Sequence, residues 1–225
     1  EFYDGLFIIA KSTGQSFDDT AAAAKEFSRQ GLSLEETLKR TNAALTLTRI
    51  SGLDAAKSVS TLTAAVNSFN KEALTQEDVV NRIANVDAKF AVSAGDLANA
   101  LSVAGSAAQG AGVSLNEFLA LITSVKQTTG QTGNVIANAF KGIFVRTRRN
   151  DTLDELERIG IAARDSAGNT LPMVQILKNL ANVQGNLTDT QKSYIEDLTA
   201  GTYRINQLKA ALGDVSKANG IFANS

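Results

Sequence analysis

The sequence predicts an all-α protein of about ten short packed helices, with one small β-hairpin near residues 161–171. Segments repeatedly open with Ser or Thr, carry an acidic or amide side chain three positions later, and close with Gly. Apolar residues recur at helical spacing between these signals. No heptad seam lasts for three repeats, which favours short helices that fold back on one another over a long coiled coil.

The helix starts can be followed along the chain. Ser33 with Glu36 predicts a capping box, in which each side chain accepts a backbone N–H of the first turn, and Gly52 ends that helix. The same signal, Ser or Thr followed by Asp, Glu or Gln, recurs at Ser16/Asp19, Thr75/Asp78, Ser93/Asp96, Ser114/Glu117 and Thr188/Gln191. Gly-Leu-Ser-Leu at 31–34 and Gly-Val-Ser-Leu at 112–115 are alike, and we interpret them as one helix-start chemistry used twice.

The most informative stretch runs from Thr128 to Pro172. A helix with a wide apolar face ends in a basic cluster, and an acidic helix start follows, as the helix macrodipole favours. The apolar face is formed by Val135, Ile136, Ala139, Phe140, Ile143 and Phe144, the basic cluster by Arg146, Arg148 and Arg149, and the acidic start by Asp151, Asp154 and Glu155. Residues 161–164 and 169–171, joined by Asp-Ser-Ala-Gly, predict the β-hairpin.

The positions of the glycines between helical segments predict the domain organisation. Residues 1–16 are expected to be an N-terminal lead-in, and 17–110 a first helical half that ends in a glycine cluster. A second helical half with the hairpin is expected over 111–218, packed with the first as one domain, and 219–225 as a frayed end. Because the sequence begins at Glu1 without Met, we expect a fragment of a longer chain.

Composition restricts the chemistry. The formal net charge is −1, which argues against a polycationic protein that binds nucleic acid. Cys and His are absent, so zinc fingers and Cys/His nucleophile–base pairs are excluded. An enzyme would have to use carboxylates, Ser/Thr, Lys or Tyr alone. We expect no enzymatic activity, no cofactor, no metal and no small-molecule substrate.

Each candidate site has a simpler structural interpretation. The carboxylate pairs Asp18/Asp19, Glu35/Glu36 and Glu77/Asp78 lie at helix starts, where capping explains them better than acid–base catalysis. Residues 165–169 resemble part of a calcium loop but are better explained as a turn. The candidate interaction residues are Arg146, Arg148 and Arg149. We favour helix-end and inter-helix pairing for them, and DNA contact remains the alternative.

An ordered set of motifs resembles the core region of phage tail tape measure proteins. The resemblance runs from Gly31 to Leu180. It rests on Gly112-Val-Ser-Leu, the helix Thr128–Lys141, the segments Leu153–Gly160 and Asp165–Pro172, and the upstream helices from Gly31 to Phe69. The central helix has the form Gly-Asn-Val-Ile-Ala-Asn instead of the Ala-Gly-Thr-Ala form, which we interpret as a subfamily difference.

The resemblance implies a structural virion protein of the tail lumen, present in the host cytoplasm during assembly. Such a protein would set tail length by templating tube assembly and would take part in genome ejection. Its implied partners are other tape measure copies, tail tube and tail tip proteins, and tail assembly chaperones. Two alternatives stay open: a membrane-active helical segment that aids DNA passage through the host envelope, and a DNA-contacting module that uses the arginine cluster.

Overall fold

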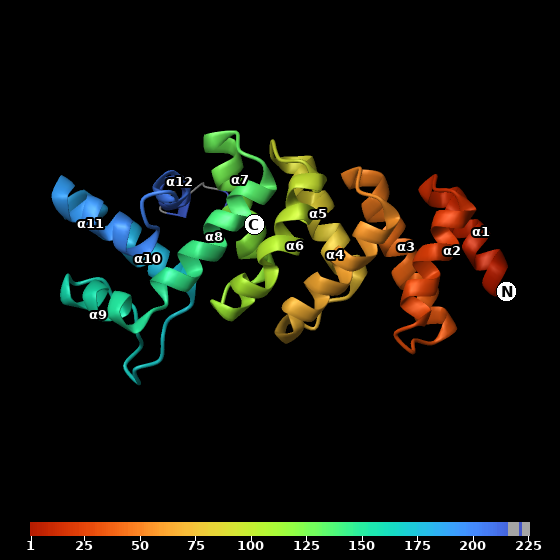
Figure 1. Cartoon of the computed structure of the whole chain (residues 1–225), viewed down its shortest axis with the longest axis horizontal. Coiled ribbons are helices and arrows are strands. Elements are labelled where there is room, and N and C mark those ends of the chain that lie inside the picture. The colour runs from red at the N-terminus through yellow and green to blue at the C-terminus, as the bar shows by residue number, and fades with distance from the viewer. Residues whose placement is uncertain (216–220, 222–225) are drawn as a thin grey trace. The chain divides into compact units, whose positions relative to one another are not determined.

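The computed structural model describes residues 1–215 and 221, and the regular structure of these residues is helical. The predicted all-α class is confirmed. Twelve α-helices and two 3-10 turns are present in the described residues (Figure 1). In chain order they are α1 (Phe2–Thr13), α2 (Phe17–Ser28), α3 (Leu34–Ser51), α4 (Ala55–Ser68), η1 (Asn70–Glu72), α5 (Gln76–Lys89), α6 (Ala94–Gly110), α7 (Leu115–Thr129), α8 (Gly133–Thr147), α9 (Asn150–Arg158), α10 (Met173–Val183), η2 (Gln184–Asn186), α11 (Asp189–Thr199) and α12 (Ile205–Val215).

The chain forms two compact units, residues 1–102 and 103–225, which we call unit 1 and unit 2. The division falls within α6. Of the predicted frayed end at 219–225, only Ile221 belongs to the described residues, and its side chain is buried.

One three-residue connector recurs directly before the start of a helix. Its first residue has a left-handed backbone, its second is a spacer, and its third is the N-cap of the next helix. Glycine takes the first position in Gly14-Gln-Ser16, Gly31-Leu-Ser33, Gly52-Leu-Asp54, Gly112-Val-Ser114 and Gly130-Gln-Thr132, with φ between 69° and 75°. Ala73 takes it in Ala73-Leu-Thr75, with φ 51°. The similarity of 31–34 to 112–115 therefore reflects a recurring connector, because glycine reaches this backbone region without a Cβ clash.

At most of these connectors, the N-cap side chain accepts a backbone N–H group from the first turn of the next helix. Thr75 and Ser114 form reciprocal capping boxes with Asp78 and Glu117, as predicted. Ser33 accepts the N–H of Glu36 at 3.2 Å. The Glu36 carboxylate instead accepts Arg40 Nε at 2.7 Å, so the predicted reciprocal box at Ser33 is only half formed.

Unit 1 is a stack in which each helix packs on its neighbours in sequence. α1 contacts α2 and α3, α2 contacts α3 and α4, and α3 contacts α4 and α5 (Figure 1). Small side chains such as Ala23, Ala44 and Ala65 are fully buried and allow close approach of the helices. The buried hydroxyls of Thr13 and Thr41 donate to carbonyls four residues earlier at 2.7 Å, which satisfies them locally.

Unit 2 is organised around α8, which contacts α7, α9, α11 and α12. Its core contains the buried rings of Phe118, Phe140 and Phe144, and the last two are stacked with centroids 5.6 Å apart. α12 returns from the C-terminal part of the chain to pack on α7. Unit 2 thus depends on contacts between distant parts of the sequence, whereas unit 1 uses helices near one another in the chain.

A hydrogen bond to a carboxylate links α9 and α11. Glu155 on α9 accepts a hydrogen bond from Arg158 Nε at 2.7 Å and one from the Tyr194 hydroxyl of α11 at 2.9 Å. Arg158 first, and Tyr194 second, lower the pKa of the Glu155 carboxyl to about 2. The hydrogen bond between Tyr194 and Glu155 also raises the pKa of the Tyr194 hydroxyl.

The predicted β-hairpin at 161–171 is wrong. The described residues contain no strand, and Arg164 and Thr170 form one isolated bridge. The flanking backbone is engaged elsewhere, because the N–H of Ile161 donates to Leu156 of α9 and that of Met173 to Ala111. A ladder therefore cannot extend beyond the bridge, and the segment is a loop anchored to its surroundings.

The expected number of about ten helices is too low. α1 lies within the segment expected to be a lead-in, and it lacks the Ser/Thr signal, since Glu1 makes no side-chain capping bond. α11 and α12 are separate helices, because Gly201 adopts φ 69° and begins a turn between them.

Substitutions at the first, left-handed position of the connector should change the stability of the protein. We expect Ala73→Gly to stabilise the protein by about 0.5–1 kcal/mol, because it relieves a left-handed alanine at some entropic cost in the unfolded chain. Gly52→Ala is the matched reverse change, and it should destabilise by about 1 kcal/mol although nothing lies within 4 Å of the added Cβ. Urea unfolding of both variants measures the effect, and shifts of the same sign would contradict it.

A second prediction concerns Glu155. Its carboxyl should titrate at about 2 in an NMR pH titration. Since the folded pKa is depressed, its contribution to stability is present above the ordinary value of 4.5 and is lost as the pH falls towards 2. Tyr194→Phe should raise the pKa, because it removes one donor to the carboxylate. Tyr203→Phe is the control: Tyr203 is almost fully exposed, and its loss should leave the Glu155 titration unchanged.

Candidate functional site

The three predicted interaction residues lie where α8 ends and α9 begins, and each contacts a different neighbour. Arg146 reaches the end of α11, Arg148 reaches the loop after α6, and Arg149 turns to the start of α9. Each guanidinium therefore faces different neighbours within unit 2.

Arg146 has the most extensive contacts of the three. Its Nη2 donates to the carbonyl of Asp197 at 2.9 Å. The guanidinium lies against Gly201, where an added Cβ would be 3.2 Å from Arg146 Cζ. The half-buried Arg146 thus closes the C-terminal end of α11, where its positive charge suits the helix dipole.

A reciprocal contact lies one turn earlier on α8. A Cβ on Gly142 would overlap the guanidinium of Arg204, the residue that precedes α12. α8 and the 201–204 turn are therefore joined by two arginine–glycine contacts of opposite direction. Gly142 was not among the predicted site residues, although an isolated glycine inside a helical pattern signals close packing.

The other two arginines make weaker contacts. Arg148 Nη1 donates to the carbonyl of Ala111 at 3.4 Å and lines a small cavity of about 280 Å³ beside Phe144 and Val145. Arg149 Nη2 lies 2.6 Å from the carboxylate of Asp151, and both side chains are exposed. Such an exposed pair contributes little to stability. The geometry of all three arginines agrees with helix-end and inter-helix pairing.

The carboxylate pairs lie at helix starts, as expected. Glu35 pairs with Lys39 at 2.8 Å and Glu36 with Arg40 at 2.7 Å. Asp78 accepts the backbone N–H and the hydroxyl of Thr75, which lower the pKa of its carboxyl. These carboxylates are held as caps and ion pairs, and that is not the arrangement of an acid–base dyad.

The segment that resembles a calcium loop is a turn. The Asp165 carboxylate accepts the backbone N–H groups of Ala167 and Asn169 at 2.9 and 2.8 Å. It also accepts the Asn169 side-chain amide, and these donors lower its pKa. Within residues 1–215 and Ile221, no group of three or more acidic side chains could hold a metal ion.

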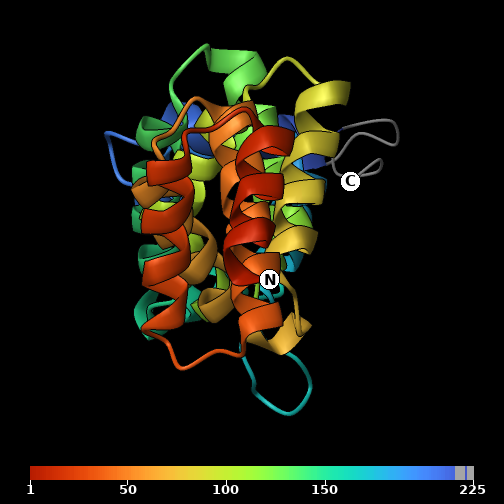
Figure 2. The same cartoon turned by 90° about the vertical axis from the view of Figure 1, so that its right-hand side faces the viewer.

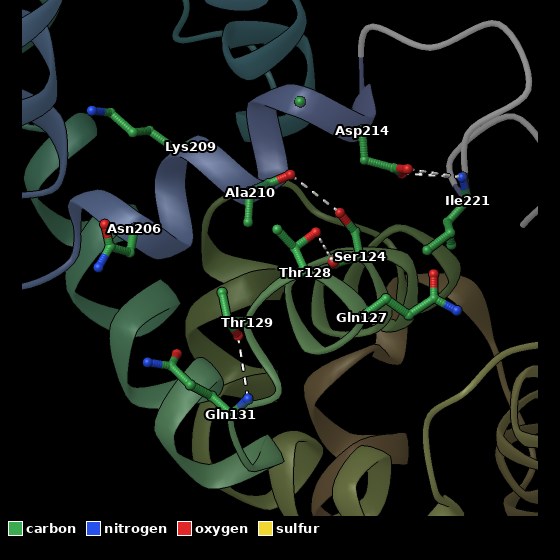
Figure 3. Close-up of a pocket in the computed structure, with 11 residues that line it drawn as sticks. Ser124, Gln127, Thr128, Thr129, Gln131, Asn206, Lys209, Ala210, Asp214 and Ile221 are labelled. Atoms are coloured by element: carbon green, nitrogen blue, oxygen red, sulfur yellow. Dashed lines mark hydrogen bonds between the residues drawn. The ribbon is translucent and has the colours of Figure 1, made fainter.

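A polar cavity lies between α7 and α12, with a volume of about 620 Å³ (Figure 3). Several of its polar groups are engaged within the fold: Ser124 donates to the carbonyl of Ala210 at 3.4 Å, and Asp214 accepts the N–H of Ile221 at 3.0 Å. Lys209 lies 3.1 Å from Glu196. The residues that line the cavity supply hydroxyls, amides, the ammonium group of Lys209 and the carboxylate of Asp214, and no nucleophile with an adjacent base is found among them.

In the part of the chain that the structure describes, no helix combines the length and apolar character needed to cross a membrane.

Comparisons with known proteins agree with the family resemblance. The family model of the phage-related minor tail proteins matches residues 9–200. Over 187 residues, the chain is 21% identical to the tape measure protein of Pneumococcus phage Dp-1. That alignment covers 82% of this chain and 16% of the relative, so the chain spans about a sixth of the relative's length. No solved structure matches the chain significantly.

The matched region contains α2 to α11, together with the recurring connectors and the arginine end of α8. The predicted resemblance to phage tail tape measure proteins is thereby confirmed. Because the family model matches most of its length, the chain belongs to the phage-related minor tail proteins.

Proposed function

We propose that this chain is a segment of a tape measure protein that sets tail length by templating tube assembly and takes part in genome ejection. The observation that carries the proposal is the family match over residues 9–200. The similarity to the Dp-1 tape measure protein supports it. The segment acts by association, without catalysis, because its carboxylates serve as helix caps and ion pairs.

The proposed place of work is the lumen of the phage tail, with the host cytoplasm as the site of assembly. The proposed partners are further copies of the chain, the tail tube and tail tip proteins, and the tail assembly chaperones. Helical faces are suitable for such contacts because they bury apolar side chains against a neighbouring helix.

The fold determines how such a segment can contribute to length. A continuous helix gains about 1.5 Å per residue, so unit 1 could span at most roughly 150 Å. In the structure, each connector turns the chain back within unit 1, and its longest helix, α3, has 18 residues. The folded unit therefore extends a tail far less than a continuous helix would.

Tail length provides the direct test. In the phage that encodes this chain, in-frame removal of residues 1–102 should shorten the tail in electron micrographs. If unit 1 works in its folded form, the shortening should be well below the roughly 150 Å of a continuous helix. Duplication of the same residues should lengthen the tail by a similar amount. Val145→Ser, which changes an exposed side chain but not the chain length, is the control.

Two results would contradict the proposal. Tails of normal length after both the deletion and the duplication would show that this segment does not contribute to length. Clearance of peptidoglycan by the purified chain in a zymogram would contradict the absence of catalysis.

The arginine cluster provides a separate prediction. Arg146→Ala should destabilise the protein by about 1 kcal/mol, because it removes a charged hydrogen bond to the carbonyl of Asp197. The cost stays modest, since that carbonyl also accepts the N–H of Gly201. Arg149→Ala, which removes an exposed ion pair, should change the stability by less than about 0.5 kcal/mol. Urea unfolding measures both effects.

The same variants test DNA contact. In a filter-binding assay, we expect that the chain does not retain duplex DNA in a strongly salt-dependent way. The reason is that the three arginines face different parts of unit 2. Salt-dependent retention that disappears when Arg146, Arg148 and Arg149 are all replaced by Ala would establish the DNA-contacting alternative.

A further inference from the structure

A small polar hollow lies inside unit 1, where the first turns of α3 meet the start of α5. Both helices begin at the same end of the unit, the lower end in Figures 1 and 2. The hollow has a volume of about 230 Å³. The residues that line it are Glu36, Lys39, Arg40, Thr75, Gln76 and Glu77. The proposed role in tail length makes no use of this hollow.

Gln76 is the most informative of these residues, because a buried amide normally has a hydrogen-bond partner. Gln76 is only 4% exposed. Its side chain makes no hydrogen bond to any residue in the described part of the chain. Neither amide atom is fully enclosed, and the residue lines the hollow, so the amide opens into it. The fold thus holds a donor and an acceptor at this wall and uses neither of them.

The start of α5 adds two backbone donors. The first N–H groups of an α-helix have no partner within the helix. The capping box engages the N–H groups of Thr75 and Asp78, each through the side chain of the other residue. The N–H groups of Gln76 and Glu77 have no partner among residues 1–215 and 221. Free N–H groups at a helix start favour an anion.

Arg40 supplies further donors from α3. Its side chain is 24% exposed, and its Nε donates to the carboxylate of Glu36 at 2.7 Å. Nη1 and Nη2 have no partner within the described residues. A guanidinium binds a carboxylate best through two parallel hydrogen bonds. Arg40 can therefore keep its contact with Glu36 and bind a second carboxylate through Nη1 and Nη2.

The charge and the size of the hollow select the class of anion. Two cations, Lys39 and Arg40, and two carboxylates, Glu36 and Glu77, line it. A wall with this balance repels a doubly charged phosphate more strongly than a singly charged carboxylate. The volume is below the roughly 300–1,000 Å³ of typical small-molecule pockets, so the bound group must be small. A carboxylate on a short chain fits both limits.

We propose that this hollow binds a carboxylate. The Nη groups of Arg40 donate to it from one side, and the Gln76 amide and the N–H groups of Gln76 and Glu77 donate from the other. An Asp or Glu side chain of a partner chain and a small free acid present the same group, so either can be the source. The site goes beyond the role in tail length, which is measured on virions, whereas binding is measured on the purified chain.

The first test is an NMR titration of the purified, ¹⁵N-labelled chain of 225 residues with sodium acetate. We expect saturable shifts of the Gln76 side-chain amide and of the N–H groups of Gln76 and Glu77, with a dissociation constant in the millimolar range. Sodium chloride at the same ionic strength is the control and should give no saturable shift of these groups. Inorganic phosphate should bind more weakly than acetate, because it carries more negative charge.

Arg40→Gln tests the guanidinium. It should weaken acetate binding by at least about tenfold, because it removes the charged donors of the site. Arg29→Gln is the matched control, since Arg29 also pairs with a glutamate of its own helix, Glu26 at 2.8 Å, but does not line the hollow. It should leave the acetate affinity unchanged. Circular dichroism verifies that both variants are folded.

Gln76→Leu separates a binding role from a structural one. The change keeps a large side chain at a buried position but removes the amide. Because the amide has no partner in the described fold, the urea midpoint should be equal to or above that of the unchanged chain. Acetate binding should weaken by at least about threefold. Unchanged acetate binding together with a lower urea midpoint would contradict the assigned role of Gln76.

A glutamate blocked at both termini identifies the source of the carboxylate, because its side chain carries the only free acid. If it binds more tightly than acetate, the site recognises an acidic side chain of a partner chain. If acetate binds more tightly, the site recognises a small free acid. Either order supports a carboxylate site.

Three results would overturn the proposal. One is the absence of a saturable shift with both acetate and the blocked glutamate. Another is equal acetate affinity in the unchanged chain and in Arg40→Gln, which would place binding elsewhere. The third is phosphate that binds more tightly than acetate, which would assign the hollow to a different class of anion.

Discussion

The fold depends on the ability of one connector to reverse the chain. A residue with a left-handed backbone follows the end of one helix, and an N-cap two positions later begins the next. Because these connectors are short, successive helices become close neighbours. The α-helices of unit 1 are also short, with between 12 and 18 residues each. The stack of α1 to α5 follows directly, since each helix can reach its first and second neighbours in sequence. The alanine-rich faces then pack closely enough to form a core with few aromatic rings.

Unit 2 begins with the same connector and is completed by different interactions. After α8, the chain continues through α9 and a loop, and later α11 returns to α8 and α12 returns to α7 and α8. Specific polar contacts fix this return, namely Arg146 against Gly201, Tyr194 with Glu155, and the N–H of Met173 with the carbonyl of Ala111. These contacts link residues far apart in the sequence.

This contrast explains what the sequence could predict. The helix starts at Ser114 and Thr188 were predictable, because a capping box is a local signal of four residues. α1 carries no such signal, and its apolar faces could equally have belonged to a strand or a loop. The hairpin prediction failed because the backbone flanking the Arg164–Thr170 bridge binds α9 and Ala111, which lie outside the segment. Likewise, the arginine cluster was visible in the sequence, but its three separate neighbours depend on the tertiary fold.

The connectors also bear on whether such a segment could work as one continuous helix. Straightening would place each glycine inside a helix, at a cost of about 1 kcal/mol. It would also remove most of the caps, at about 1 kcal/mol each. For the five glycine connectors the sum is on the order of 10 kcal/mol, which equals the whole stability of a typical domain before any loss of the core. A continuous helix is therefore disfavoured, and a ruler built from this chain would measure length by the number of folded units.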